Sequence, residues 1–113
     1  ISSGAATNAI PSWAAYCASK AALNMLSESF YLEEKEKGNE IKVYAVSPGI
    51  VDTNMQVNIR KSSEKDFSAV QNFIGLKERG ELYSPKECAK RLSTLLKATY
   101  QGQVLHDLRK VEL

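Results

Sequence analysis

Residues 13–37 contain neither glycine nor proline, and this long segment limits the possible folds more than any other part of the sequence. It is rich in Ala, Leu, Met, Glu and Lys, so it predicts one long helix with Ser12 as its N-cap. Gly38 follows a charged last turn and predicts the end of the helix. The first half of the segment is small and apolar on most sides, which predicts a helix buried on more than one face.

Strand-like runs lie on both sides of this helix. Residues 1–6 are expected to be the tail of a buried strand that runs into a small-residue turn. Residues 41–47 are rich in β-branched and aromatic side chains and end at Pro48 and Gly49, which predicts a second strand with an irregular exit. A strand, a long helix and a strand in this order indicate a parallel sheet with the helix as a right-handed crossover.

The second half of the chain has weaker signals. Residues 51–62 are expected to be irregular, and residues 64–79 predict a weak helix. Pro85 opens another helix, whose apolar residues keep a 3.6-residue spacing. Residues 104–108 are expected to add a short last strand. Two or three parallel strands make a thin sheet, because parallel sheets are normally built from more strands and covered on both faces. We therefore expect residues 1–113 to be a piece of a larger α/β domain whose first strands lie outside this sequence.

The composition argues against several other classes of protein. A net charge of +2, without clustering of the basic residues, argues against nucleic acid as a partner. No apolar run approaches the ~20 residues of a membrane span, and no basic-then-apolar leader opens the chain, so no membrane partner is expected. Cys17 and Cys88 are too few and too far apart for a disulfide framework or a metal site, which predicts a reducing, cytoplasmic location.

Three side chains with complementary chemistry are expected at the start of the long helix. Tyr16 and Lys20 are four residues apart, so both project from one helix face, and Ser3 lies thirteen residues before Tyr16 at the expected end of a strand. Open α/β sheets bind ligands at such an edge. A phenol is a poor proton donor at neutral pH unless its anion is stabilised, and a nearby ammonium group favours the phenolate. We therefore expect Tyr16 to give a proton to a carbonyl oxygen that Ser3 holds by a hydrogen bond.

The same spacing recurs later in the helix, at Tyr31 and Lys35. Here the residue thirteen positions earlier is Ala18, which has no hydroxyl group, and the pair lies in the charged half of the helix. We interpret this second pair as a surface pair.

The exit of the second strand adds a further element. Gly49 permits a close backbone approach, Pro48 ends strand pairing, and Thr53 supplies a hydroxyl group. At the carboxyl end of a parallel strand, the exposed backbone groups of this segment are suited to grip a planar amide such as the carboxamide of nicotinamide.

Together, Ser3, the Tyr16-Cys17-Ala18-Ser19-Lys20 motif and the segment Pro48-Gly49-Ile50-Val51-Asp52-Thr53 resemble the short-chain dehydrogenase/reductase family. The resemblance covers essentially the whole chain and implies that residues 1–113 are the C-terminal half of a doubly wound, Rossmann-type α/β domain, with its catalytic and substrate-binding part. It implies that Tyr16 is the acid/base, that Ser3 orients the substrate carbonyl, and that Lys20 also binds the nicotinamide ribose. The residues that it implies for cofactor binding are Tyr16, Lys20, Pro48, Gly49, Val51 and Thr53.

Shorter motifs are similar to the sepiapterin reductase and benzil reductase branch: Gly4-Ala5-Ala6, Trp13-Ala14-Ala15-Tyr16-Cys17, Leu32-Glu33-Glu34 and Val51-Asp52-Thr53-Asn54-Met55-Gln56. That branch implies an NADPH-dependent reduction of a ketone or vicinal diketone. NAD is not excluded, because the residues that read the ribose 2′ position lie outside this sequence. Sepiapterin reductases anchor the pterin with an Asp near the C-terminus; Asp107 lies out of register with it, so a small diketone is favoured. The Gly-rich turn that cradles the pyrophosphate is absent, so the chain alone is not expected to bind a dinucleotide tightly.

Several residues keep two interpretations. Ser2 takes the orienting role if the register slips by one, Thr53 is also suited to cap a following helix, and Trp13 either lines the substrate pocket or only packs. A mobile apolar lid over the substrate, or else ordinary core, is expected from four side chains after the Pro–Gly exit: Met55, Phe67, Phe73 and Ile74.

The assembly and the overall role also leave alternatives. The apolar surface of the long helix predicts a homodimer or homotetramer formed through that helix. A competing hypothesis treats the chain as a truncated, inactive piece that serves only as an oligomerisation or interaction module. A small helical regulatory domain is a third, disfavoured by the strand at residues 41–47. Cys17 is expected to pack as a small apolar residue, and His106 is expected in or beside the last strand without a catalytic role.

Overall fold

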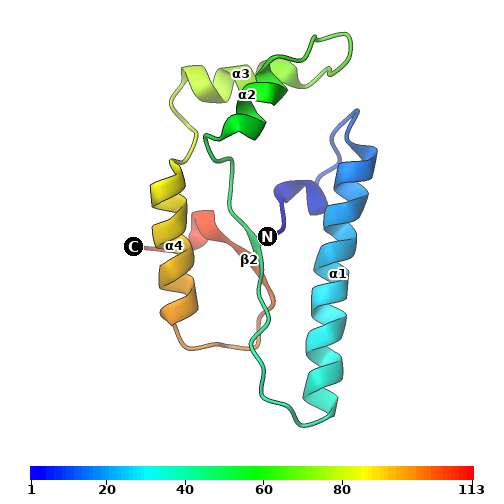
Figure 1. Cartoon of the computed structure of the whole chain (residues 1–113), viewed down its shortest axis with the longest axis vertical. Helices are drawn as coiled ribbons and strands as arrows, with labels where there is room; N and C mark the ends of the chain where they lie inside the picture. Colours follow the sequence, from blue (N-terminus) through cyan, green and yellow to red (C-terminus); the bar gives the residue numbers. More distant parts are fainter.

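Two short parallel strands lie between two helices in the computed structural model, which describes residues 1–113 (Figure 1). Strand β1 (Ala45–Ser47) pairs in parallel with β2 (Leu105–Asp107). Helices α1 (Ala14–Glu36) and α4 (Pro85–Lys97) stand on opposite sides of the strands, and the chain crosses from β1 to β2 through α4. The predicted parallel α/β arrangement is confirmed.

The long helix α1 matches its predicted limits within one residue, but its N-terminus differs from the prediction. Trp13 is the N-cap residue and makes no side-chain capping hydrogen bond. Ser12 has a φ of 73° and donates its hydroxyl hydrogen to the carbonyl oxygen of Asp66 over 3.0 Å. The prediction of Ser12 as N-cap is therefore wrong, because a long-range contact takes the hydroxyl group that a cap would need.

The first residues run beside β1 as an extended segment. The amide of Ser2 donates to the carbonyl oxygen of Val46 over 2.7 Å, and the chain then turns into the short 3-10 helix η1 (Gly4–Ala6). Strand β1 itself is shorter than predicted: residues 41–44 have no strand partner within the chain, so only its last three residues form a ladder with β2.

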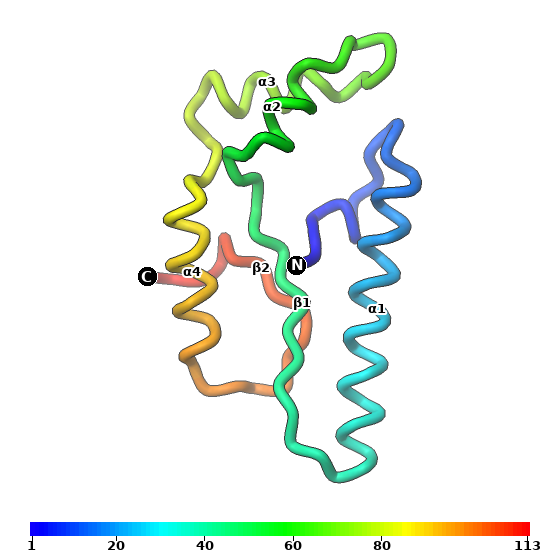
Figure 2. The backbone as a smooth tube through the Cα atoms, in the orientation of Figure 1, coloured from blue at the N-terminus to red at the C-terminus, as the bar shows by residue number.

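The chain after β1 forms two short helices at the carboxyl end of the strands, next to the start of α1 (Figure 2). Helix α2 (Asn54–Arg60) lies in the segment predicted to be irregular, so that prediction is wrong; α3 (Val70–Glu78) occupies the second half of the predicted weak helix. Helix α4 begins at Pro85, as predicted, and Ser84 accepts the amide hydrogen of Glu87 as its N-cap.

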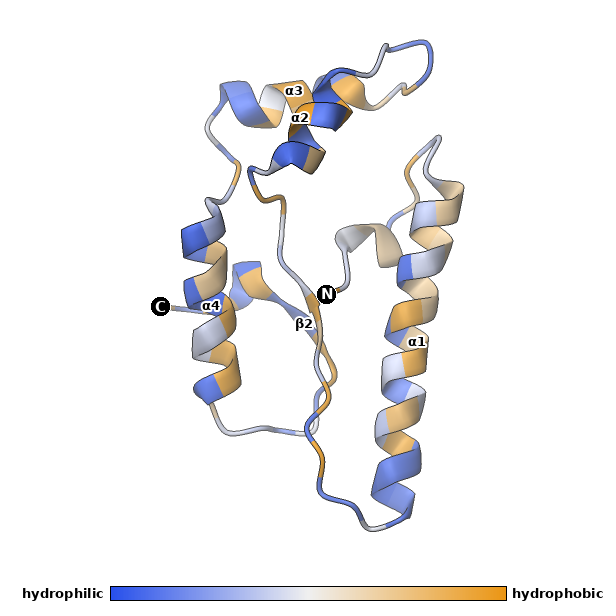
Figure 3. Ribbon diagram, viewed as in Figure 1, coloured by the Kyte–Doolittle hydropathy of each residue, from blue (hydrophilic) through white to orange (hydrophobic).

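The core is small and lies around β1 and at the α2–α3 connection. Its buried apolar residues are Ala5, Ala45, Val46, Phe67, Val70, Val104 and Leu108. Helix α1 contacts η1 and β1 but has no buried residue, so it is not buried on more than one face within this chain. The ribbon colours of Figure 3 show that hydrophobic residues recur along most of α1. Four large apolar side chains of this helix are exposed: Met25, Leu26, Phe30 and Leu32.

The last strand continues into a 3-10 turn, η2 (Leu108–Lys110), which a charged side chain holds against α4. The guanidinium group of Arg91 donates to the carbonyl oxygens of Leu108 and Val111 and forms an ion pair with Glu87. His106 lies in β2, as predicted, with its Nε2 atom 2.8 Å from the carbonyl oxygen of Gln103. None of the helices combines the length and the apolar character that crossing a membrane requires.

Candidate active site

Tyr16 and Lys20 lie together on the first turns of α1, near the carboxyl end of β1. The ammonium nitrogen of Lys20 lies 5.7 Å from the centroid of the Tyr16 ring. The same nitrogen donates to the carbonyl oxygen of Ile1 over 3.0 Å, so the lysine joins the helix to the segment that contains Ser3. The phenol oxygen of Tyr16 makes no hydrogen bond within the chain, which leaves its proton available to a ligand.

The two candidate serines have different surroundings. Ser2 is buried and donates its hydroxyl hydrogen to the side-chain oxygen of Asn24. Ser3 is half-buried, and its hydroxyl oxygen accepts the amide hydrogen of Ala5 over 3.1 Å at the start of η1. A hydroxyl oxygen that accepts one hydrogen bond still has its own hydrogen to donate. Ser3 therefore has a free donor and Ser2 does not.

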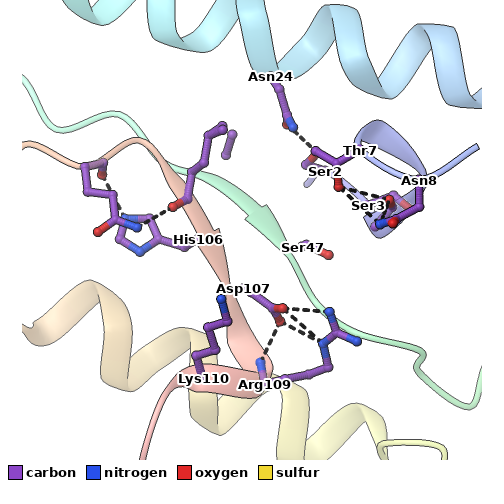
Figure 4. A pocket seen from close by; sticks show the side chains of 14 residues that line it. Ser2, Ser3, Thr7, Asn8, Asn24, Ser47, His106, Asp107, Arg109 and Lys110 are labelled. Carbon is purple, nitrogen blue, oxygen red and sulfur yellow. Dashed lines mark hydrogen bonds and ion pairs between the residues drawn. The ribbon is translucent and has the colours of Figure 1, made fainter.

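Ser3 lines a polar cleft of about 220 Å³ between α1 and the two strands (Figure 4). This cleft is bounded by the serines, by Asn24 from α1 and by a charged group from the end of β2. The charged side chains are Asp107 and Arg109, which form a two-pronged ion pair with a shortest distance of 2.7 Å. Hydrogen bonding to the Arg109 guanidinium lowers the pKa of Asp107, so this carboxylate is ionised at neutral pH.

Tyr16 lines a second, apolar cleft of about 380 Å³ between the start of α1 and α2. Its lining residues are Ser12, Trp13, Ala15, Tyr16, Met55 and Ile59. The structure thus brings Trp13 and Met55 beside the tyrosine, whereas Ser3 lines the other cleft. The four side chains expected to form a lid are divided. Met55 is 50% exposed beside this cleft, whereas Phe67 is buried and belongs to the core. Phe73 and Ile74 are half-buried and do not line the cleft.

The exit from β1 has an ordered backbone that the sequence did not reveal. Tyr83 pairs with Val51 as an isolated parallel bridge: its amide donates to Ile50 and its carbonyl oxygen accepts from Asp52, both over 2.9 Å. In such a bridge the amide and carbonyl groups of Val51 point to the opposite side, and they make no hydrogen bond within the chain. One residue paired in isolation leaves no periodic pattern, so no sequence signal could have identified Tyr83.

Gly49 and Thr53 have geometry that sequence reasoning anticipated in part. Gly49 has a φ of 81°, and a Cβ atom there would lie 3.2 Å from the Tyr83 ring and from the Arg109 side chain. Only glycine fits this turn. Thr53 is the N-cap residue of α2, as one of its two interpretations held, although its side chain makes no capping hydrogen bond. The remaining candidate, Pro48, precedes the glycine and is half-buried.

The other reactive side chains do not assemble into a site. Cys17 is half-buried, with its sulfur 3.8 Å from the carbonyl oxygen of Asn8, and both cysteines are free. No group of His, Cys, Asp and Glu side chains has the arrangement of a metal site.

Comparison with known proteins gives consistent relatives. The family model for short chain dehydrogenases matches residues 1–64. A benzil reductase ((S)-benzoin forming) of Bacillus cereus is 45% identical over 107 residues, which are 93% of this chain and 43% of that protein. A sepiapterin reductase of Bos taurus is 36% identical over 96 residues, 85% of this chain and 34% of that protein. The crystal structure of the KRED1-Pglu enzyme superposes with a TM-score of 0.79 at 33% identity, covering 92% of this chain and 44% of that one.

The chain thus spans less than half the length of these relatives. Its parallel strands and helices are part of a Rossmann-type α/β domain, as the fold prediction held. Sequence similarity and fold agree with each other and with the motifs around Tyr16: the chain belongs to the short-chain dehydrogenase family.

Proposed function

We propose that this chain contributes the catalytic and substrate-binding part of a carbonyl reductase that uses NADPH, or NADH, to reduce a ketone or vicinal diketone to an alcohol. The observation that carries the proposal is the position of Lys20, whose ammonium group lies over the ring of Tyr16, and Tyr16 lines an apolar cleft. The similarity to benzil reductases, which act on an aromatic vicinal diketone, supports the substrate class.

In this proposal Tyr16 is the proton donor. When bound, the reduced nicotinamide supplies a hydride to the carbonyl carbon. The phenol of Tyr16 gives its proton to the carbonyl oxygen as negative charge develops there, and the charge of Lys20 stabilises the resulting phenolate. Lys20 is held by the carbonyl oxygen of Ile1, so its direction is fixed before a substrate binds.

Ser3 is proposed to donate to the carbonyl oxygen that Tyr16 protonates, which requires the bound carbonyl group to reach from the apolar cleft toward the polar cleft that Ser3 lines. Its hydroxyl oxygen is oriented by the amide of Ala5, and its hydrogen remains available to a substrate. Ser2 is disfavoured because its hydrogen already bonds to Asn24 in the interior. A donor aimed at the developing oxyanion is worth about 10²–10³-fold in turnover, so Ser3→Ala should reduce activity by that order. Ser2→Ala should mainly reduce stability.

The residues after β1 fit the nicotinamide end of the cofactor. The free amide and carbonyl groups of Val51 offer one donor and one acceptor side by side, which matches the two functions of a carboxamide. Gly49 keeps the backbone turn tight, and the exposed hydroxyl group of Thr53 lies two residues beyond Val51. The chain has no Gly-rich turn to cradle a pyrophosphate, so these residues provide only the nicotinamide part of the site.

The substrate is proposed to enter the apolar cleft with one of its substituents against Trp13 and Met55. An apolar wall next to a phenol and an ammonium group suits a carbonyl compound with a hydrophobic substituent. The carboxylate of Asp107 is engaged by the guanidinium group of Arg109, which competes with any contact to a pterin, so a small diketone is preferred.

The exposed apolar side chains of α1 bear on assembly. Met25, Leu26 and Phe30 support the proposal of a homodimer or homotetramer formed through α1. The same surface favours the second candidate function, in which the chain acts only as an interaction module without turnover. A cytoplasmic location is proposed separately, from the two free cysteines.

The deciding experiment measures oxidation of NADPH and of NADH by the intact protein with benzil and with butane-2,3-dione. We expect turnover of at least one diketone and a loss of about 10²–10⁴-fold in Tyr16→Phe, the usual contribution of a positioned proton donor. Size-exclusion chromatography at several concentrations tests the oligomer. An intact, folded and oligomeric protein without turnover on any carbonyl compound would favour the interaction module instead.

A further inference from the structure

Trp13 lies at the centre of an aromatic cluster that joins three parts of the chain. Its ring stacks on Phe67 with a centroid distance of 5.1 Å and an interplanar angle of 11°, and it lies 5.3 Å from the tilted ring of Phe73. The Tyr16 ring meets it edge-on, at 5.6 Å and 82°. Stacked and edge-to-face pairs at these distances are favourable beyond the area that they bury.

A second contact ties the same two parts of the chain together. Ser12, directly before Trp13, donates its hydroxyl hydrogen to the carbonyl oxygen of Asp66, directly before Phe67. Ser12 adopts a φ of 73°, a conformation that costs energy in a residue other than glycine and persists only where its surroundings enforce it. The residues at the N-terminus of α1 are therefore joined to the α2–α3 connection by one hydrogen bond and one aromatic stacking contact.

The Tyr16 ring depends on this arrangement for its direction. Its phenol oxygen has no hydrogen-bond partner in the chain, and the cap of α1 makes no side-chain hydrogen bond that would stiffen the first turn. The ring is held by neighbours on its sides: the Trp13 ring, and the ammonium group of Lys20 at 5.7 Å. Removing Trp13 would leave the phenol free to turn about its side-chain bonds.

We propose that Trp13 is a positioning residue: it transmits the packing of Phe67 and Phe73 to the ring of Tyr16 and so aims the phenol at the substrate carbonyl. The inference rests on the proposed function, because it assigns a role within the same site. Trp13 also borders the apolar cleft, but its ring packs against three other rings, those of Tyr16, Phe67 and Phe73, so we assign its main effect to the direction of Tyr16 rather than to substrate affinity.

The test compares Trp13→Leu and Trp13→Phe in the intact protein with butane-2,3-dione, a substrate too small to fill the cleft. We expect Trp13→Leu to lower kcat about tenfold or more while KM changes less than about threefold, since a misaimed donor is lost mainly in the transition state. Trp13→Phe keeps an aromatic ring beside Tyr16 and should restore most of kcat. A raised KM with unchanged kcat would make Trp13 a plain cleft wall and overturn the inference.

Met55→Ala is the matched control on the opposite wall of the cleft. Met55 takes no part in the aromatic cluster, so its truncation should raise KM for benzil more than it lowers kcat. Equal losses of kcat in Met55→Ala and Trp13→Leu would show that any gap in the cleft has this effect, and the positioning role would be withdrawn.

A double-mutant cycle with Phe73→Leu tests the route of the effect. Phe73 contacts Trp13 and Phe67, so we expect Phe73→Leu to lower kcat in the wild-type background and to have no further effect in the Trp13→Leu background. Additive losses would overturn the proposed route. If Trp13→Leu does not fold, the test rests on Trp13→Phe and Phe73→Leu, because the inference requires Phe73→Leu to lower kcat.

A wild-type protein that reduces no carbonyl compound would overturn the proposed function and this inference together. An active wild type with unaffected Trp13 variants would overturn only the inference.

Discussion

Helix α1 contains two tyrosine–lysine pairs with the same four-residue spacing, and their surroundings differ. Near its start, Tyr16 lies between the Trp13 ring and the ammonium group of Lys20 and lines a cleft. Near its end, Tyr31 packs edge-on against Tyr100, with ring centroids 5.9 Å apart, and Lys35 is exposed without an ion pair.

The difference shows how little the spacing alone decides. Four-residue spacing places both members of each pair on one helix face, which is a property of any helix. In the proposed mechanism, the chemistry at the first pair depends on Lys20, which the segment before η1 holds over the Tyr16 ring. The second pair has no such segment, and its tyrosine joins an aromatic contact. Tyr31 is half-buried, so the interpretation of this pair as a surface pair is correct only for Lys35.

The largest expected difference between the pairs is in the loss of the phenol. In the intact protein, Tyr16→Phe should lower turnover by about 10²–10⁴-fold, because it removes the proton donor. Tyr31→Phe keeps its ring against Tyr100 and should leave turnover within about twofold of wild type, since a surface change away from the site has little effect. Steady-state rates with one diketone measure both. Equal losses would mean that neither hydroxyl group acts as the donor.

Loss of the ammonium group should also affect activity only at the first pair, but by a smaller factor than loss of the phenol. Lys20→Met removes the charge beside Tyr16 and the hydrogen bond to Ile1, and we expect kcat/KM to fall about 10²-fold, the scale of one lost electrostatic contact in an active site. Lys35→Met should be neutral. Lys20→Arg, which restores the charge but not the shape, is the informative control. If it recovers full activity, charge alone accounts for the role of Lys20.

Strong local signals predicted the fold well. Gly38 and the charged last turn set the end of α1, and the Pro85 start of α4 was visible because Ser84 and Pro85 form a standard helix beginning. Helix α2 was missed because its seven residues include Val57 and Ile59, which lower helix propensity, and because so short a helix has no clear periodicity.

The site was predicted only where its residues are near in sequence. Tyr16 and Lys20 were found from their helical spacing, and the structure places them together. The contact of Ser12 with Asp66, more than fifty residues away, could not be read from local patterns, and it is the reason why the predicted cap is wrong. Ser3 lies in the polar cleft and Tyr16 in the apolar one, a division that depends on how η1 turns away from β1.

Gly102 tests how closely the Tyr31 end is packed. It has a φ of 78°, and a Cβ atom there would lie 3.1 Å from the phenol oxygen of Tyr31. Gly38 has a φ of 76° with nothing within 4 Å, so Gly38→Ala gives the backbone effect alone, about 1–2 kcal/mol. We expect Gly102→Ala to lower the free energy of unfolding by more than this, because the Tyr31 ring must also move. Chemical denaturation measures the free energy of unfolding of both variants. Equal losses would mean that the Tyr31 ring moves aside at no measurable cost.

The smallest effect concerns the aromatic partner of Tyr31. Burial raises the pKa of Tyr100, whose hydroxyl group donates to the carbonyl oxygen of Val43 over 2.9 Å and lies near Tyr31 and Tyr44. Because the folded pKa exceeds the unfolded value of about 10, this group contributes stability below that pH and the contribution is lost as the pH rises through the folded value. Tyr100→Phe should therefore flatten the decline of the denaturation midpoint above about pH 10. Tyr16→Phe, which leaves Tyr100 and Val43 untouched, serves as the reference for the other end of α1. A decline equally steep in Tyr100→Phe and in wild type would show that ionisation of Tyr100 does not cause the loss of stability at high pH.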